Sequence, residues 1–200
     1  MPISTPVLDD FNRANGSLGA SWTDVITVGD SALTISSNQV TGSGTAFCSG
    51  YWNVGQFGAR QEAYVTVATK VANTENCGVY VRLVSPGTAG VDGYYVETVT
   101  QAGTDQIKVF RIDNGVFTTI GSTINQEWTA GDILRFYANG SVLQVFVISG
   151  GVETQAGSDY SDTTYQTGGY IGMDCENTTG RLDSFGGGTV PARMPLMGVG

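Results

Sequence analysis

The sequence predicts an all-β protein, an antiparallel β-sandwich of jelly-roll type formed by a single domain. Three observations predict it. About ten to fourteen short apolar or alternating segments follow one another at roughly even spacing along the 200 residues. The 29 glycines, together with nine tyrosines and eight phenylalanines, suit short strands joined by tight turns. No segment carries a long apolar stripe at helical spacing.

The strongest hairpin signal lies in residues 131–151. Two runs rich in β-branched and aromatic residues, 132–138 and 141–148, flank Asn139-Gly140, the pair best able to adopt the positive φ angles of a type I′ turn. The second run is apolar at nearly every position, so we expect a strand covered on both sides.

The first strand of this hairpin alternates. Leu134 and Phe136 share one face and Arg135 and Tyr137 the other, because successive side chains in a strand point to opposite sides. We therefore expect one buried and one wetter face, with the hairpin at the middle of the sandwich.

The remaining strands are expected in order along the chain. They are 5–11, 32–35, 39–41, 62–71, 78–84, 94–100, 106–112, 116–120, 167–173 and 181–185. Ser37-Asn38 and Asn114-Gly115 are the turn signals between neighbouring strands. The glycine-rich segment 42–58 fits either a strand pair or a long surface loop. These elements form a sandwich over residues 1–187, followed by a tail, 188–200.

Composition limits the partners. A net charge of −9 would repel phosphate backbones, and no cluster of Lys and Arg counters it, so nucleic acid is not expected. No stretch is long and apolar enough to cross a bilayer, and residues 1–10 lack the pattern of an export signal. Cys48, Cys77 and Cys175 are expected to be small buried thiols, since their spacing suits no zinc site and the chain has no histidine.

The order of several short motifs resembles a known family. Asp9-Asp10-Phe11-Asn12-Arg13 with Gly16-Ser17-Leu18-Gly19 and Trp22 looks like the opening of concanavalin A-like, laminin-G-like jelly-roll modules. The motifs that follow in the family's order are Tyr94-Tyr95-Val96, Lys108-Val109-Phe110-Arg111, Ala130-Gly131-Asp132 and Leu182-Asp183-Ser184-Phe185. Such modules include lectins, carbohydrate-binding modules, laminarinase-type glycosidases and phage virion proteins, so the resemblance implies a fold more than a function.

Catalysis is not expected. The resemblance implies that a glycosidase of this fold would carry Glu-x-Asp-x-Glu or a close variant on one strand, and no segment here does. The absence of histidine also excludes Ser-His-Asp and Cys-His arrangements. The remaining possibility for hydrolysis is a pair of carboxylates brought together from distant strands.

Glycan binding needs only an exposed aromatic ring beside polar groups. The candidate stacking residues are Tyr51, Trp52, Tyr94 and Tyr95, although each could instead fill the core; Trp22 and Trp128 are expected in the core.

For metal binding, the resemblance implies that the first and last strands lie side by side, which would bring Asp9 or Asp10 near Asp183. Oxygen ligands of this kind suit a structural Ca²⁺, and solvated turn-capping carboxylates are the alternative.

The tail is apolar and contains Pro191 and Pro195, which exclude regular structure. We expect it to dock into a partner as an extended peptide through Val190, Met194, Leu196, Met197 and Val199. Packing against its own sandwich is the alternative.

Together these features favour a non-catalytic virion structural protein, a capsid decoration or tail-associated jelly roll that is made in the host cytoplasm and binds other virion proteins. Adhesion to cell-surface glycans would be compatible with that role, and the chain could form homo-oligomers. The alternative is a secreted lectin or carbohydrate-binding module, and a laminarinase-type glycosidase comes last.

Overall fold

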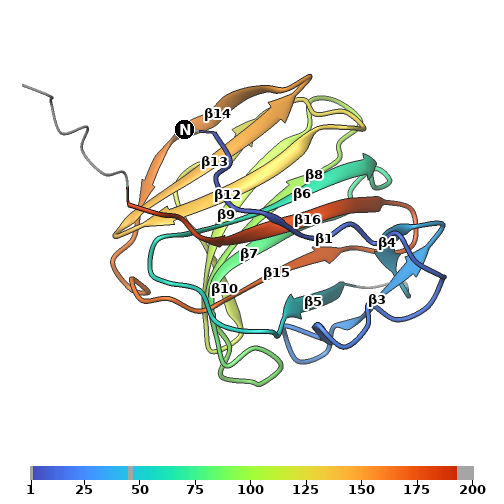
Figure 1. The fold of residues 1–200 in the computed structure, drawn as a ribbon. Helices are drawn as coiled ribbons and strands as arrows, with labels where there is room; N and C mark the ends of the chain where they lie inside the picture. Colours follow the sequence, from blue (N-terminus) through green and yellow to red (C-terminus); the bar gives the residue numbers. More distant parts are fainter. Residues whose placement is uncertain (1, 45–46, 193–200) are drawn as a thin grey trace, which may run out of the picture.

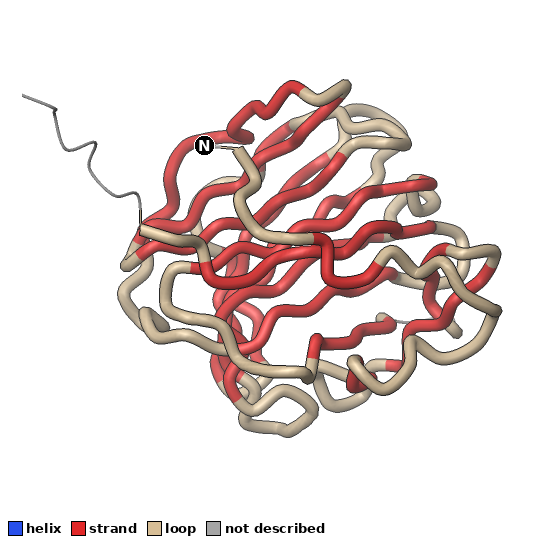
Figure 2. The backbone as a smooth tube through the Cα atoms, in the orientation of Figure 1, coloured by secondary structure: helices blue, strands red, loops and turns tan. Residues whose placement is uncertain are grey.

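The computed structural model describes residues 2–44 and 47–192, which consist of strands, turns and loops (Figure 2). The strands are β1 (Val7–Asp9), β2 (Trp22–Asp24), β3 (Ser31–Ser36), β4 (Gln39–Gly42), β5 (Cys48–Trp52), β6 (Gln61–Thr69), β7 (Asn76–Val84), β8 (Asp92–Val99), β9 (Gln106–Asp113), β10 (Val116–Thr119), β11 (Ile124–Asn125), β12 (Ile133–Asn139), β13 (Val142–Ser149), β14 (Val152–Ser161), β15 (Tyr170–Cys175) and β16 (Arg181–Thr189). The all-β jelly-roll prediction is therefore confirmed.

The strands form two layers (Figure 1). Layer A runs β4-β16-β6-β12-β13-β14, with β1 paired to β16, and layer B runs β10-β9-β8-β7-β15-β5. Strand β3 joins them, because it pairs with β4 on one side and with β5 on the other. The β3–β5 pair is parallel, an exception to the predicted antiparallel pairing.

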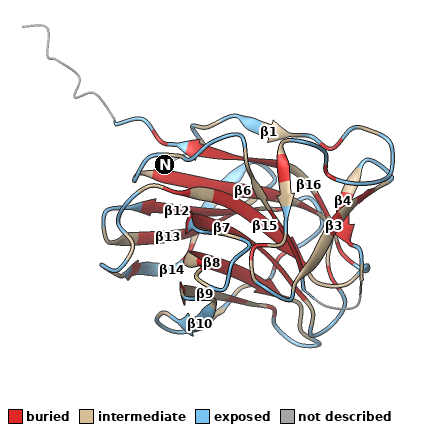
Figure 3. Cartoon of the chain, turned by 90° about the horizontal axis from the view of Figure 1, so that it is seen from below, coloured by how far each residue is buried: buried red, intermediate tan, exposed pale blue. Residues whose placement is uncertain are grey.

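The core lies between the layers. Val65 and Phe136 from layer A and Val79 and Val96 from layer B belong to one buried cluster, which also contains Trp22 and Trp128 as expected. Figure 3 shows the central strands buried and the edge strand β10 exposed. Cys48, Cys77 and Cys175 are all buried, as the sequence predicts.

The central hairpin forms as predicted, but its turn is shifted by one residue. Asn139 pairs with Val142 as the last rung of the ladder, so Gly140 and Ser141 make the turn. Gly140 has a φ of 57°, while Asn139 stays in the strand. A single positive φ on a glycine at the first turn position is the requirement of a type II′ turn.

The expected wetter face of β12 is in fact buried. Arg135 is 0% exposed and Tyr137 4%. The Arg135 guanidinium binds Glu62 of β6, with Nε 2.7 Å from Glu62 Oε2, and Nη1 lies 2.8 Å from Glu153 Oε2. A charged residue in an alternating strand suggested solvent, but here it is paired with a carboxylate from the neighbouring strand β6 and with another from β14, two strands away.

The first and last strands lie side by side, as the resemblance implies (Figure 1). The last strand runs to Thr189, past the expected domain end at residue 187. Val190 is 3% exposed, packs with Tyr137 and Phe146 on layer A, and donates its N–H to Arg60 O at 2.8 Å. The prediction that Val190 docks into a partner is therefore wrong, because its side chain is used on its own sandwich. Met194, Leu196, Met197 and Val199 lie outside the described residues.

Strand β14 was not predicted, because its sequence is polar and it forms the exposed edge of layer A. Within residues 2–44 and 47–192, no helix is present that is long and apolar enough to span a membrane.

Candidate functional site

The outer face of layer B, which points away from layer A, carries a row of aromatic rings. Tyr80 of β7, Tyr95 of β8 and Phe110 of β9 are direct neighbours in the ladder. They alternate with Val79, Val96 and Val109, which point into the core. Tyr80 and Tyr95 stack with centroids 4.3 Å apart, and Tyr95 and Phe110 stack at 5.9 Å. Phe117 of β10 ends the row, edge-on to Tyr95 and to Phe110.

These rings line a groove of about 420 Å³. Its lining residues are Thr27, Asp30, Phe47, Tyr80, Tyr95, Glu97, Phe110, Gly115 and Phe117. Tyr80 and Tyr95 are 3% and 2% exposed because their faces cover each other, whereas Phe117 is 38% exposed and Phe47 46%. A ligand would therefore meet the phenylalanine rings, with the two tyrosines behind them.

Two carboxylates stand in this apolar groove. Asp30 comes from the loop after β2, where its Oδ2 accepts hydrogen bonds from Thr27 N and Ser49 Oγ. Glu97 lies on β8, two residues after Tyr95 and on the same face, with its Oε1 3.6 Å from Lys108 Nζ. Burial raises the pKa of both carboxyl groups above their ordinary values, since desolvation penalises the charged form.

A third carboxyl group lies behind the groove. Asp174 of β15 and Glu97 of β8 are both paired with Gly78 of β7, which lies between them in the sheet. Gly78 has no room for a side chain, because a Cβ there would lie 2.1 Å from Val96 O and 2.6 Å from the Tyr95 ring. The Tyr95 ring covers this gap, and its hydroxyl donates to Asp174 Oδ2 at 3.0 Å.

Asp174 is fully buried, and burial raises its pKa well above the ordinary value. Its Oδ1 accepts no hydrogen bond within the described part of the chain. Glu97 and Asp174 share one sheet face two strands apart, and two carboxyl groups on one face are the first requirement of two-carboxylate hydrolysis. Asp174, however, lies behind Tyr95 and is not among the groove's lining residues, so it is not placed to touch a substrate there.

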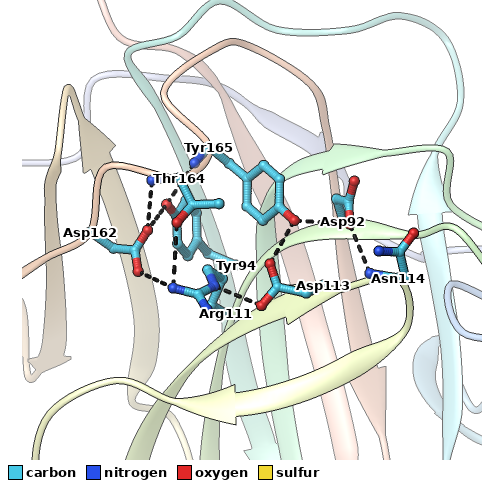
Figure 4. Close-up of polar contacts among 8 residues, drawn as sticks. All are labelled: Asp92, Tyr94, Arg111, Asp113, Asn114, Asp162, Thr164 and Tyr165. Atoms are coloured by element: carbon cyan, nitrogen blue, oxygen red, sulfur yellow. Dashed lines mark hydrogen bonds and ion pairs between the residues drawn. The ribbon is translucent and has the colours of Figure 1, made fainter.

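A polar network holds the hairpin that carries Phe110 and Phe117 (Figure 4). Arg111 binds Asp113 at 2.7 Å and Asp162 at 2.9 Å, which ties the hairpin to the loop after β14. The Tyr165 hydroxyl donates to Asp113 Oδ1 at 2.7 Å and is 2.9 Å from Asp92 Oδ1, which also accepts the N–H of the turn residue Asn114. Because these groups satisfy one another, we assign the network to positioning the groove wall.

The four predicted sugar-stacking residues do not form one patch. Tyr94 is 0% exposed in the core, and Tyr95 is 2% exposed between Tyr80 and Phe110, so both predictions of stacking on a sugar are wrong. Tyr51 is half-buried against Tyr170, and Trp52 is half-buried edge-on to Trp22. Adjacent residues of a strand point to opposite faces, so neither Tyr51-Trp52 nor Tyr94-Tyr95 could present two rings to one ligand.

The three predicted metal ligands make separate local contacts. The Asp9 carboxylate binds Arg13 at 2.6 and 2.8 Å and accepts Trp22 Nε1 at 2.8 Å. Burial raises its pKa, but these donors and Phe11 N–H outweigh burial and lower it overall. Asp10 caps the N–H of Asn12, and Asp183 accepts the N–H of Ser184. Among the described residues, no group of three or more His, Cys, Asp or Glu is placed to hold a metal ion.

Of the residues that line the groove, the sequence singled out Tyr95 alone as a candidate stacking residue. Three of the lining residues share one signal, which is an aromatic residue opposite the valines in three successive predicted strands: Tyr80, Tyr95 and Phe110. The strand register then fixes them in one row. Asp30 and Phe47 come from loops and carry no such signal.

Comparison with known proteins identifies the fold. No family model matches the sequence, and no curated protein matches it. Among solved structures, the chain is similar to the carbohydrate-binding module CBM66 from Bacillus subtilis, with 15% identity, a TM-score of 0.62, and coverage of 86% of this chain and 98% of that one. A legume lectin-like domain from Entamoeba histolytica matches with 12% identity, a TM-score of 0.56, and coverage of 86% and 91%.

A xylan β-1,4-xylosidase from Bacillus halodurans C-125 matches with 13% identity and a TM-score of 0.62. The match covers 93% of this chain but 40% of the xylosidase. These similarities confirm the resemblance: the chain has a concanavalin A-like, lectin-type jelly-roll fold. At such low identity they show the fold and not the ligand.

Proposed function

We propose that this protein is a non-catalytic carbohydrate-binding module of lectin type, and that its glycan binds in the groove on the outer face of layer B. The observation that carries the proposal is the groove itself. Within about 420 Å³ it combines exposed phenylalanine rings with two carboxylates and a threonine. The similarity to a carbohydrate-binding module and to a lectin-like domain supports it as a likeness of fold.

The chemistry of the lining suits a sugar ring. The C–H face of a pyranose packs on an aromatic face, for which Phe117 and Phe47 are the exposed rings. The sugar hydroxyls then donate to the carboxylates of Asp30 and Glu97, which are half-buried and buried in the chain without ligand. A few fixed polar groups in a largely apolar groove provide orientation, which is the usual composition of a small-ligand site.

The virion role that the sequence favoured rested on docking of the tail. Val190 packs on its own sandwich, and none of the solved structures named above is a virion protein. Glycan binding therefore replaces it as the proposed function.

Replacing Phe117 with Ala should weaken glycan binding about tenfold or more, because the sugar loses the exposed stacking ring that strand β10 contributes. Ligands would first be found on a glycan array and then titrated by calorimetry. The matched control is Val116→Ala in the same strand, since Val116 is 64% exposed and does not line the groove. Equal affinity for F117A and wild type, or an array without any ligand, would contradict the proposal.

A further inference from the structure

We propose that the glycan bound in this groove carries positive charge, as an amino sugar with a free amine does; this rests on the proposed function above. The ionisable side chains that line the groove are the carboxylates Asp30 and Glu97 and the phenols Tyr80 and Tyr95. No Lys or Arg is among the described residues that line it. At neutral pH the phenols are uncharged, so the charge of the lining is negative.

Two further acids lie behind the groove, of which Asp174 adds little charge, because burial raises its pKa well above the ordinary value and favours the neutral carboxyl group. Asp174 lies against Tyr95, which covers it from the groove. Glu176 follows two residues later and accepts hydrogen bonds from Asn76 N and Nδ2, both at 3.1 Å. A uronate or sialate would have to bring another carboxylate toward this group of acids, which like-charge repulsion disfavours.

The cation paired with Glu97 is already engaged. Lys108 lies opposite Glu97 in the ladder, with Nζ 3.6 Å from Oε1, and its side chain is 30% exposed. One partly exposed ammonium at this distance compensates Glu97 in part, and Asp30 is bound by the neutral donors Thr27 N and Ser49 Oγ. The Asp30 carboxylate and the part of the Glu97 carboxylate that Lys108 does not neutralise are therefore able to bind a ligand ammonium.

The rings favour the same ligand. A cation near the face of an aromatic ring is attracted by the ring quadrupole, and Phe110, Phe117 and Phe47 line the groove beside the two carboxylates. A protonated amino sugar combines an apolar ring face for the phenylalanines with an ammonium for the acids. An N-acetylated sugar of the same skeleton keeps the ring face but loses the charge.

The test compares three oligosaccharides of equal length by calorimetry at pH 7: β-1,4-linked glucosamine, its fully N-acetylated form, and a galacturonate oligomer. We expect the glucosamine oligomer to bind about tenfold tighter than the acetylated one at an ionic strength of about 0.1 M, and the galacturonate oligomer to bind weakest. Raising the salt to about 1 M should reduce this preference, because charges in a groove open to solvent are screened.

Three variants locate the effect. Asp30→Asn and Glu97→Gln should each reduce the preference for the glucosamine oligomer, whereas Lys108→Gln should increase it by removing the competing cation. An acetylated oligomer that binds as tightly as glucosamine, or a preference that D30N and E97Q leave unchanged, would overturn the inference while glycan binding stands. If none of the three oligomers binds while another glycan on the array does, the inference is overturned and the proposed function stands. If F117A and wild type bind every glycan with equal affinity, the proposed function fails and the inference falls with it.

Discussion

Replacing Arg135 with Ala should lower the free energy of unfolding by about 3–5 kcal/mol, because it leaves the Glu62 carboxylate buried without its counter-ion. Both side chains are 0% exposed, and the guanidinium approaches Glu62 Oε2 with Nη2 at 2.5 Å. The ring of Phe146 lies 4.9 Å from the guanidinium carbon, so packing is lost as well. Denaturant unfolding, followed by tryptophan fluorescence, measures the change.

Two controls separate the charge from the packing. The double variant Glu62→Gln with Arg135→Met should be much closer to wild type, since a neutral pair of similar volume leaves no buried charge. Glu153→Gln should cost less than R135A, because the Glu153 side chain is 17% exposed and water can replace part of the pair. A cost below about 1 kcal/mol for R135A would show that this ion pair is not the buried anchor of layer A that the structure describes.

Replacing Arg82 with Ala should cost about 2–3 kcal/mol, because one guanidinium holds three loops at one end of the sandwich. Its donors bind Ala59 O at 2.6 and 3.0 Å, Gly140 O at 2.7 Å and Tyr165 O at 2.8 Å. Hydrogen bonds to a charged group contribute about 1.5–3 kcal/mol each, and water at the loops restores part of the loss. Unfolding in denaturant again gives the magnitude.

Alanine keeps the Cβ of Arg82, so the backbone strain of its φ of 55° is the same in the variant and in wild type. The matched control is Arg181→Ala. That guanidinium also binds a loop, through Thr178 O and Gly180 O at 2.7 and 2.8 Å, but the residue is half-exposed. We expect a clearly smaller cost for R181A, and equal costs would show that burial of Arg82 adds nothing.

The sequence was sufficient for most of the fold because its signals were local. Alternation and turn residues located β3, β4, β9 and β10 to within about two residues, and Ser37, Asn38 and Asn114 adopt the positive φ that such turns need. The exposed edge strand β14 was missed because it has little apolar pattern to detect.

The candidate site could not be predicted from the sequence, because it depends on the pairing register of three strands. The alternation of residues shows that Tyr80 points away from its neighbouring valines. The pairing of three strands is what places Tyr80 beside Tyr95 and Tyr95 beside Phe110. Tyr94 and Tyr95 were indistinguishable as neighbours, and the structure places one in the core and the other in the outer row. Arg135 was placed in solvent for a similar reason, since its partners Glu62 and Glu153 come from other strands.

The most direct test of the central claim is a crystal structure of the protein with a bound oligosaccharide. We expect a sugar ring against Phe117, with a hydroxyl or amino group within hydrogen-bond distance of Asp30 or Glu97. A sugar bound elsewhere, for example against Tyr51 or in the depression formed by residues 120–124 and 157–161, with the groove left empty, would contradict it.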